Sequence, residues 1–304
     1  MTDNRQPYTA VVIGCGFIGS RFNETPFFDP RHTHAASYKM HKKTELIGVC
    51  DSDPVRAKQA ALHWSVKPYS DAAAMLQQTK PAFVSIASST ASHKDMLELV
   101  LQTPSVKSVL CEKPISESAS ESLKIVDSFR KKNIFFGVNY SRRYNGGFNK
   151  VKDMIEKGIL GKLQLGHVIY QNGILNNGSH FIDLLRYLVG EISAVRADHE
   201  PQAGYTSNLS GILEFKNGLR VMLQGTTPDG AAFAEIDIIG TKGRIRTEQS
   251  GHCIFHYDLE PSPLFSGYND FVRSKNISDG IMDNTYNAVQ DLIECVEGQR
   301  IAPR

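Results

Sequence analysis

The sequence lacks the features that mark membrane-spanning, secreted and nucleic-acid-binding proteins. No apolar stretch approaches the ~20 residues that a transmembrane helix needs, and the leader from Met1 to Thr9 is polar, unlike a signal peptide. The 304 residues carry a formal net charge of only +2. We therefore expect neither nucleic acid nor a membrane as a partner, and we expect a cytoplasmic protein.

Paired cysteines, internal repeats and low-complexity segments are also missing. No two cysteines form a C-x-x-C pair, which disfavours a zinc site or a disulfide framework; the five are Cys15, Cys50, Cys111, Cys253 and Cys295. Hydrophobic residues make up 41% and charged residues 22%, as in ordinary globular proteins. Because single cores stop growing at roughly 250–300 residues, the length suggests two domains.

A glycine-rich turn stands near the amino terminus. The apolar run that begins at Val11 breaks into a G-x-G-x-x-G pattern, in which the first glycine turns the chain, the second lets backbone approach a pyrophosphate and the third lets a helix pack closely. The following helix would turn its amino terminus toward the phosphates. The pattern also fits an ordinary turn. The candidate cofactor contacts here are Gly14, Cys15, Gly16, Phe17, Ile18 and Gly19.

An acidic residue follows the second predicted strand. Prolines between Phe22 and Thr33 interrupt any helix and indicate an inserted loop, after which the apolar run 46–50 ends at Asp51. In dinucleotide-binding units an acid at this place accepts hydrogen bonds from ribose hydroxyls and repels a 2′-phosphate. Asp51 therefore favours NAD over NADP, unless it merely begins a turn.

Strands alternate with helices as far as Val138, which predicts a doubly wound parallel sheet. A capping box of Ser92 and Asp95 predicts the start of one of these helices. Further on, strand-like runs dominate and the hairpin signal at 216–218 indicates an antiparallel sheet. The expected organisation is α/β: a dinucleotide-binding domain over 1–138 and an α+β substrate domain over 139–304, with a last helix near 286–297.

Read together, the glycine turn, Asp51, the triplet 112–114 (Glu-Lys-Pro) and the segment 178–183 (Gly-Ser-His-Phe-Ile-Asp) resemble the Gfo/Idh/MocA family of nicotinamide-dependent oxidoreductases. The resemblance follows nearly the whole chain in order. It implies a Rossmann domain that binds NAD, an open mixed sheet, and a sugar, cyclitol or nucleotide-linked sugar as substrate. It also implies a homodimer or homotetramer formed through the open face of that sheet.

Two residues are the main catalytic candidates. Lys113 follows a strand, and the carboxyl ends of strands are where open α/β sheets bind ligands. A lysine can protonate a developing alkoxide directly, whereas acting as a base requires its pKa to fall from about 10.4. The resemblance makes His180 its partner in proton transfer. The alternatives are a surface lysine before a turn and a structural histidine on an apolar helix.

The sequence departs from the family at Asn176, where many members carry a catalytic aspartate. An amide cannot exchange a proton, although it can orient a substrate hydroxyl. Two other functions therefore stay open: transient use of bound NAD for elimination or hydrolysis, and an NAD-binding sensor or partner subunit without catalysis.

The resemblance implies further contacts on both sides of the nicotinamide. For the cofactor these are Ser88, Thr90, His93 and Glu112, and for the substrate Tyr140, Arg142, Lys113, Asn176 and His180. Helix capping and a solvated charged face are the alternative roles for the hydroxyls, the acid and the arginine.

Overall fold

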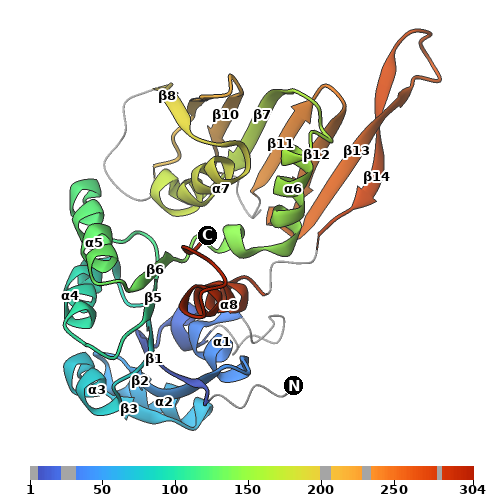
Figure 1. Cartoon of the computed structure of the whole chain (residues 1–304). Helices are drawn as coiled ribbons and strands as arrows, with labels where there is room; N and C mark the ends of the chain where they lie inside the picture. The colour runs from blue at the N-terminus through green and yellow to red at the C-terminus, as the bar shows by residue number, and fades with distance from the viewer. Residues whose placement is uncertain (1–5, 22–31, 199–206, 228–233, 279–282) are drawn as a thin grey trace. The chain divides into compact units, whose positions relative to one another are not determined.

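The computed structural model describes residues 6–21, 32–198, 207–227, 234–278 and 283–304. The chain divides into two compact units, Met1–Tyr144 with Met282–Arg304 and Asn145–Ile281 (Figure 1). Most of the inserted loop expected from Phe22 to Thr33 lies outside the described residues.

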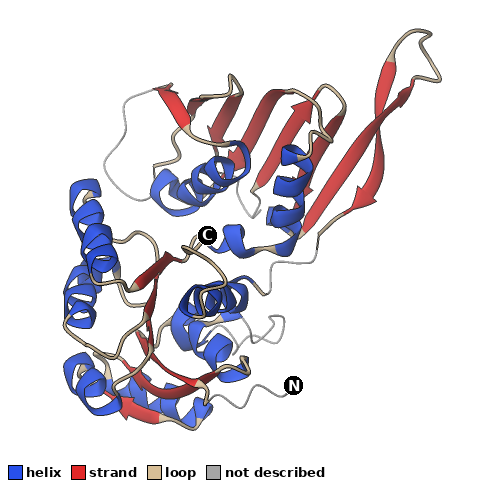
Figure 2. Ribbon diagram, in the orientation of Figure 1, coloured by secondary structure: helices blue, strands red, loops and turns tan. Residues whose placement is uncertain are grey.

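The first unit is built on six parallel strands in the order β3-β2-β1-β4-β5-β6. This is the strand order of the dinucleotide-binding Rossmann fold. The expected fold class is confirmed. Figure 2 shows strands in red and helices in blue. The strands are β1 (Tyr8–Ile13), β2 (Thr44–Cys50), β3 (Lys67–Tyr69), β4 (Phe83–Ile86), β5 (Ser108–Cys111) and β6 (Phe135–Val138).

Helices cover both faces of this sheet because its strands are apolar on both sides. Along β1, Ala10 and Val12 pack into one core, and Val11 and Ile13 pack into the other. The first core takes helices α1 (His34–Met40), α2 (Pro54–Trp64) and α8 (Asn284–Val296), and the second takes α3 (Ala72–Thr79), α4 (Thr90–Leu101) and α5 (Ala119–Lys131).

Helix α8 belongs to the first unit, whereas the expected division placed it in the second. Its residues Ala288, Val289 and Leu292 are fully buried in the same core as Tyr38 of α1. Period-3.6 patterning shows that a helix has an apolar face, but it does not show which sheet that face meets. The first unit is therefore made of two separate stretches of sequence.

Helix α4 begins earlier than its capping-box pattern indicates. Ser89 is the N-cap residue, and Ser92 lies inside the first turn, where its hydroxyl donates to Ser89 O and Ser88 Oγ, each at 2.8 Å. The hydroxyl of Ser92 thus turns back onto the loop after β4. By contrast, Ser118 is the N-cap residue of α5, and its hydroxyl accepts from the Glu121 amide.

The second unit is an eight-stranded sheet in the order β14-β13-β12-β11-β7-β10-β9-β8. Only β7 and β10 pair in parallel; the other neighbouring strands pair antiparallel. The strands are β7 (Leu163–Tyr170), β8 (Ile192–Ala197), β9 (Gly211–Phe215), β10 (Arg220–Gly225), β11 (Glu235–Gly240), β12 (Gly243–Glu248), β13 (Cys253–Pro261) and β14 (Asn269–Asn276).

One face of this sheet packs against helices α6 (Gly146–Glu156) and α7 (Ser179–Val189) (Figure 1). Residues that alternate with the buried ones are partly buried or exposed; Leu165 and Met222 are exposed. Over the described part of the chain, no helix is both long and apolar enough to cross a membrane. Nor do three His, Cys, Asp or Glu side chains gather within those residues in a way that could hold a metal ion.

Candidate cofactor and catalytic site

The three glycines of the turn occupy three different environments. A Cβ on Gly14, whose φ is +100°, would lie 2.5 Å from the main chain of Ala87, and one on Gly19 would lie 2.0 Å from the carbonyl oxygen of Gly14. A Cβ on Gly16 would meet no atom within 4 Å. The first and third glycines therefore permit close packing, and the second leaves open space in front of the backbone.

A short π-helical turn, η1 (Phe17–Arg21), starts after Gly16 and contains Gly19. The sequence predicts that a helix starts directly after the turn. Within the described residues the first α-helix is α1, which begins at His34. Phe17 is exposed, while Ile18 packs against the core.

Asp51 lies where the sequence places it, directly after β2. Its Oδ2 accepts a 2.8 Å hydrogen bond from the Cys15 amide, and its Oδ1 accepts one of 2.9 Å from the Asp53 amide. Arg56, in the first turn of α2, places Nε 3.7 Å from Asp51 Oδ1 and 3.3 Å from Asp53 Oδ2. The carboxylate is held in place by main-chain donors and faces a guanidinium.

A cavity of about 370 Å³ opens over the carboxyl ends of β1, β2 and β4. It brings together four predicted cofactor contacts, Gly14, Gly16, Asp51 and Ser88. The sequence reasoning missed Ser52, Arg56, Ser70, Ser89, Ser92 and Met96, which also line it. Arg56 had a readable signal, a basic residue in the first turn after the strand-end acid. Backbone amides and small hydroxyls can donate to phosphates, and an acid can accept from ribose hydroxyls, which are the contacts that a dinucleotide needs.

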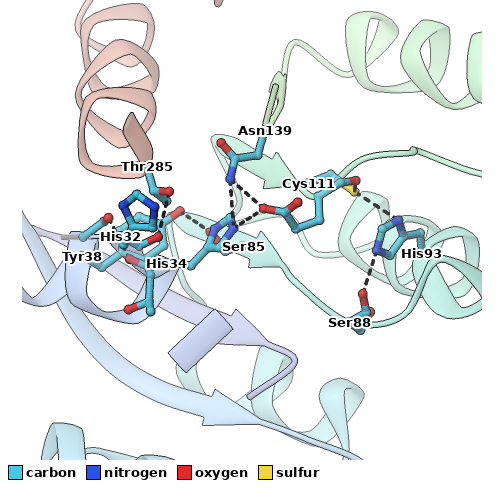
Figure 3. Close-up of polar contacts among 12 residues, drawn as sticks. His32, His34, Tyr38, Ser85, Ser88, His93, Cys111, Asn139 and Thr285 are labelled. Atoms are coloured by element: carbon cyan, nitrogen blue, oxygen red, sulfur yellow. Dashed lines mark hydrogen bonds and ion pairs between the residues drawn. The ribbon is translucent and has the colours of Figure 1, made fainter. Parts of the chain in front are cut away.

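Thr90 and His93 lie on α4 and are not among the residues that line this cavity. Thr90 is the half-buried first residue of the helix. His93 is buried; its Nδ1 lies 2.7 Å from Pro114 O and its Nε2 3.1 Å from Ser88 O (Figure 3). His93 thus ties the loop after β4 to the segment that follows Lys113.

Lys113 is half-buried just after β5. Burial lowers its pKa from the ordinary value; the charge of Glu112 opposes this shift, and the charge of Arg142 adds to it. The lowered pKa makes this lysine better suited to exchange a proton at the edge of the sheet than an exposed lysine would be.

Glu112 points into a buried cluster that the sequence reasoning did not identify. Its Oε1 lies 3.0 Å from His34 Nε2 and accepts a 2.6 Å hydrogen bond from Asn139 Nδ2 (Figure 3). His34 Nδ1 lies 2.8 Å from Ser85 Oγ. No spacing rule links these residues, since they come from α1, β4 and the ends of β5 and β6.

Tyr140 and Arg142 lie at the end of the first unit. Tyr140 directly precedes the 3₁₀ helix η4 (Ser141–Tyr144), which contains Arg142, and both side chains are partly buried. Burial lowers the pKa of Arg142 to about 10, so it stays a cation at neutral pH. Arg142 lies in the same unit as Lys113, and its positive charge lowers the pKa of Lys113.

In the second unit, Asn176 and His180 lie on consecutive turns of helical chain. Asn176 is exposed in the π-helical segment η5 (Gly173–Gly178), and His180 is the half-buried second residue of α7. Ser179 Oγ donates to Asn176 O at 2.8 Å and covers one carbonyl at this junction. The pair is four residues apart, so its side chains share one face of the helical turn.

Comparisons with known proteins match both units. Residues 8–140 match the family described as "Oxidoreductase family, NAD-binding Rossmann fold", and residues 170–246 match the "GFO/IDH/MocA C-terminal domain". The D-apiose dehydrogenase of Rhizobium rhizogenes is 26% identical over 81% of this chain and 75% of its own length. The myo-inositol 2-dehydrogenase of Thermotoga maritima is 25% identical over 77% of this chain and 73% of its own.

Solved structures share the fold. The WlbA dehydrogenase from Bordetella pertussis, solved in complex with NADH and UDP-GlcNAcA, superposes with a TM-score of 0.73 at 19% identity, covering 99% of this chain and 90% of that one.

Proposed function

Because the chain belongs to the Gfo/Idh/MocA family of oxidoreductases, with an NAD-binding Rossmann domain, we propose that it is an NAD-dependent dehydrogenase of a sugar or cyclitol, with nucleotide-linked sugars as the substrate class to try first. The observation that carries the proposal is Lys113, a half-buried lysine of lowered pKa at the carboxyl edge of the sheet that forms the dinucleotide cavity. Relatives named as apiose and inositol dehydrogenases support a polyhydroxylated substrate.

The glycine turn and Asp51 suit NAD. Open space at Gly16 admits the pyrophosphate, and the Asp51 carboxylate accepts from ribose hydroxyls. When bound, NAD supplies the acceptor for a hydride from a carbinol carbon.

The residues of the chain then manage the proton. As the C–H bond of the carbinol breaks, the hydroxyl loses its proton to the neutral amine of Lys113, and the carbon becomes a ketone. In the reverse direction the Lys113 ammonium returns that proton to the oxygen. We assign His180 as the second proton-exchanging group and Asn176 as the residue that orients a substrate hydroxyl.

The test is Lys113→Ala, assayed with NAD and a panel of sugars, cyclitols and nucleotide-linked sugars. We expect kcat to fall by about 10²–10⁴-fold, with Kd for NAD within about twofold of the parent. Undiminished turnover would refute the role of Lys113. Product without net NADH would instead show transient oxidation, and saturable binding without product would show a sensor.

A further inference from the structure

A chain of polar side chains crosses the interior of the first unit, from α1 to the end of β5. The Tyr38 hydroxyl lies 3.0 Å from Ser85 Oγ, which lies 2.8 Å from His34 Nδ1 (Figure 3). On the other side of the ring, His34 Nε2 lies 3.0 Å from Glu112 Oε1, the oxygen that also accepts from Asn139. Two donors from different elements therefore converge on one oxygen of Glu112.

This arrangement contains the residue types of a hydrolytic triad, but its burial excludes that function. Both His34 and Ser85 are fully buried, so no substrate can reach the serine hydroxyl. The ring nitrogen that faces the carboxylate must carry a hydrogen. The hydroxyls of Ser85 and Tyr38 can each donate or accept, so the other ring nitrogen of His34, Nδ1, also has a hydrogen-bond partner.

The contacts of His34 and Asn139 with Glu112 Oε1 favour the ionised form of Glu112. Burial raises the pKa of this carboxyl. His34, through its hydrogen bond and its charge, the Asn139 amide and the charge of Lys113 all lower the pKa, and together they outweigh burial. The net direction is downward, so Glu112 stays ionised at neutral pH. His34 contributes more to this lowering than Asn139 does.

Glu112 in turn acts on Lys113, its neighbour in sequence. The charged groups that act on Lys113 are the carboxylate of Glu112, which raises its pKa, and the guanidinium of Arg142, which lowers it. Burial raises the pKa of the Cys111 thiol and of the Tyr38 hydroxyl, so both are neutral at neutral pH. From α4, His93 faces the Pro114 carbonyl.

We propose that His34 is a positioning residue for the reaction, which holds Glu112 as a buried anion beside Lys113 and so sets the pH at which Lys113 exchanges its proton. The proposal rests on the proposed function for its catalytic meaning. Its physical content, control of Lys113 through Glu112, can be measured without turnover.

Three variants test the roles of Glu112 and His34 separately. Glu112→Gln removes the negative charge and keeps the shape of the side chain. His34→Met removes the donor, while His34→Gln is of similar length and keeps an N–H that can reach the carboxylate. Thermal melting and NAD titration establish that each variant is folded, and the isosteric Glu112→Gln carries the test if His34→Met does not fold.

The titration of Lys113 is read directly by competitive labelling with trace acetic anhydride between pH 6 and 11, followed by peptide mass spectrometry. Because an anion stabilises the ammonium, its loss in Glu112→Gln moves the Lys113 midpoint to lower pH by about half a unit or more. In His34→Met, Glu112 takes up a proton more readily, so the midpoint moves in the same direction by a smaller amount. His34→Gln restores the parent midpoint.

The double variant His34→Met/Glu112→Gln decides whether His34 acts through Glu112. We expect its midpoint to equal that of Glu112→Gln alone. Two results overturn the proposal, even when Lys113→Ala abolishes turnover. One is that His34→Met shifts the Lys113 midpoint as much in the Glu112→Gln background as it does in the parent. The other is that Glu112→Gln alone leaves the midpoint unchanged. Conversely, an active Lys113→Ala enzyme refutes the catalytic role while the labelling result stands by itself.

Discussion

The main-chain amide of Cys15 donates a 2.8 Å hydrogen bond to Asp51 Oδ2, which joins the glycine turn directly to the end of β2. Asp51 thus has a structural task in addition to the ribose contact predicted for it. Its other oxygen accepts from the Asp53 amide and faces Arg56. Both the acid and the guanidinium line the cavity.

Cofactor preference depends on this pair. In Asp51→Ser, we expect NAD to bind about tenfold more weakly, since a charged acceptor is lost. NADP should bind more tightly, because Arg56 then faces a 2′-phosphate without the competing carboxylate. Fluorescence titrations with NADH and NADPH measure both. The gain for NADPH should vanish in Asp51→Ser/Arg56→Ala; a parent enzyme that already prefers NADPH would contradict the assignment.

The second and third glycines of the turn should respond differently to alanine. At Gly16 the added methyl meets open space, so the melting temperature should change little while NAD binding falls by more than about tenfold. At Gly19 the methyl collides with the Gly14 carbonyl, which should cost about 1–3 kcal/mol of stability. Thermal melts and NAD titrations of both variants make the comparison. Equal destabilisation by the two substitutions would count against these environments.

The pH dependence of alcohol oxidation should report Lys113. Burial and Arg142 lower its pKa below 10.5, so kcat/KM should rise with pH through that lowered pKa and level off above it. Arg142→Gln removes a positive charge that favours the neutral amine, and the rise should move to higher pH. Arg143→Gln, its neighbour in η4, is the matched control. A shift to lower pH in Arg142→Gln would disprove this electrostatic role.

Asn176 should act on binding more than on chemistry. Asn176→Ala removes a hydrogen bond to a substrate hydroxyl and should raise KM about five- to tenfold. Asn176→Asp should leave kcat within about threefold of the parent, because Lys113 and His180 carry the proton. Steady-state kinetics separate the two parameters. If Asn176→Asp raised kcat a hundredfold, the native chain would lack an essential acid, as a sensor would.

The open face of the second sheet is the expected contact between copies of the chain. The exposed side chains of Leu165 and Met222 lie on this face. The face also carries two ion pairs, Arg244 with Asp237 and Arg246 with Glu235. Such a face can pair with itself across a twofold axis. Met222→Glu should shift the parent oligomer toward monomer in sedimentation velocity, whereas Leu264→Glu in the β13–β14 turn should not. An unchanged sedimentation coefficient for Met222→Glu would contradict the proposal.

The sequence predicted those helices and strands in which the order of apolar and polar residues follows the buried face. The buried strands of the first sheet, the glycine turn and Asp51 follow from apolar runs and a single motif. Strand β14 was missed because its residues Asn269–Asn276 are almost all exposed and polar, so they show no alternation.

Contacts between distant segments could not be predicted. His34, Ser85, Glu112 and Asn139 meet only because the helical crossovers of the fold bring β4, β5 and β6 side by side next to α1. Arg56 stands three residues after Asp53, the N-cap residue of α2, yet only the fold shows that Arg56 lines the cavity. Family resemblance indicated Lys113, His180 and Glu112, but the buried partners of Glu112, His34 and Asn139, were found only in the structure.

The burial of α8 in the first unit has a consequence for synthesis of the protein. A ribosome has made all of the second sheet before it adds the helix that covers the apolar surface beside α1 and Tyr144. The nascent dinucleotide domain therefore carries an uncovered apolar face until α8 has been synthesised. Chains released before Asn284 would expose that face to other proteins, and binding of NAD to the growing chain should mature only once α8 has emerged.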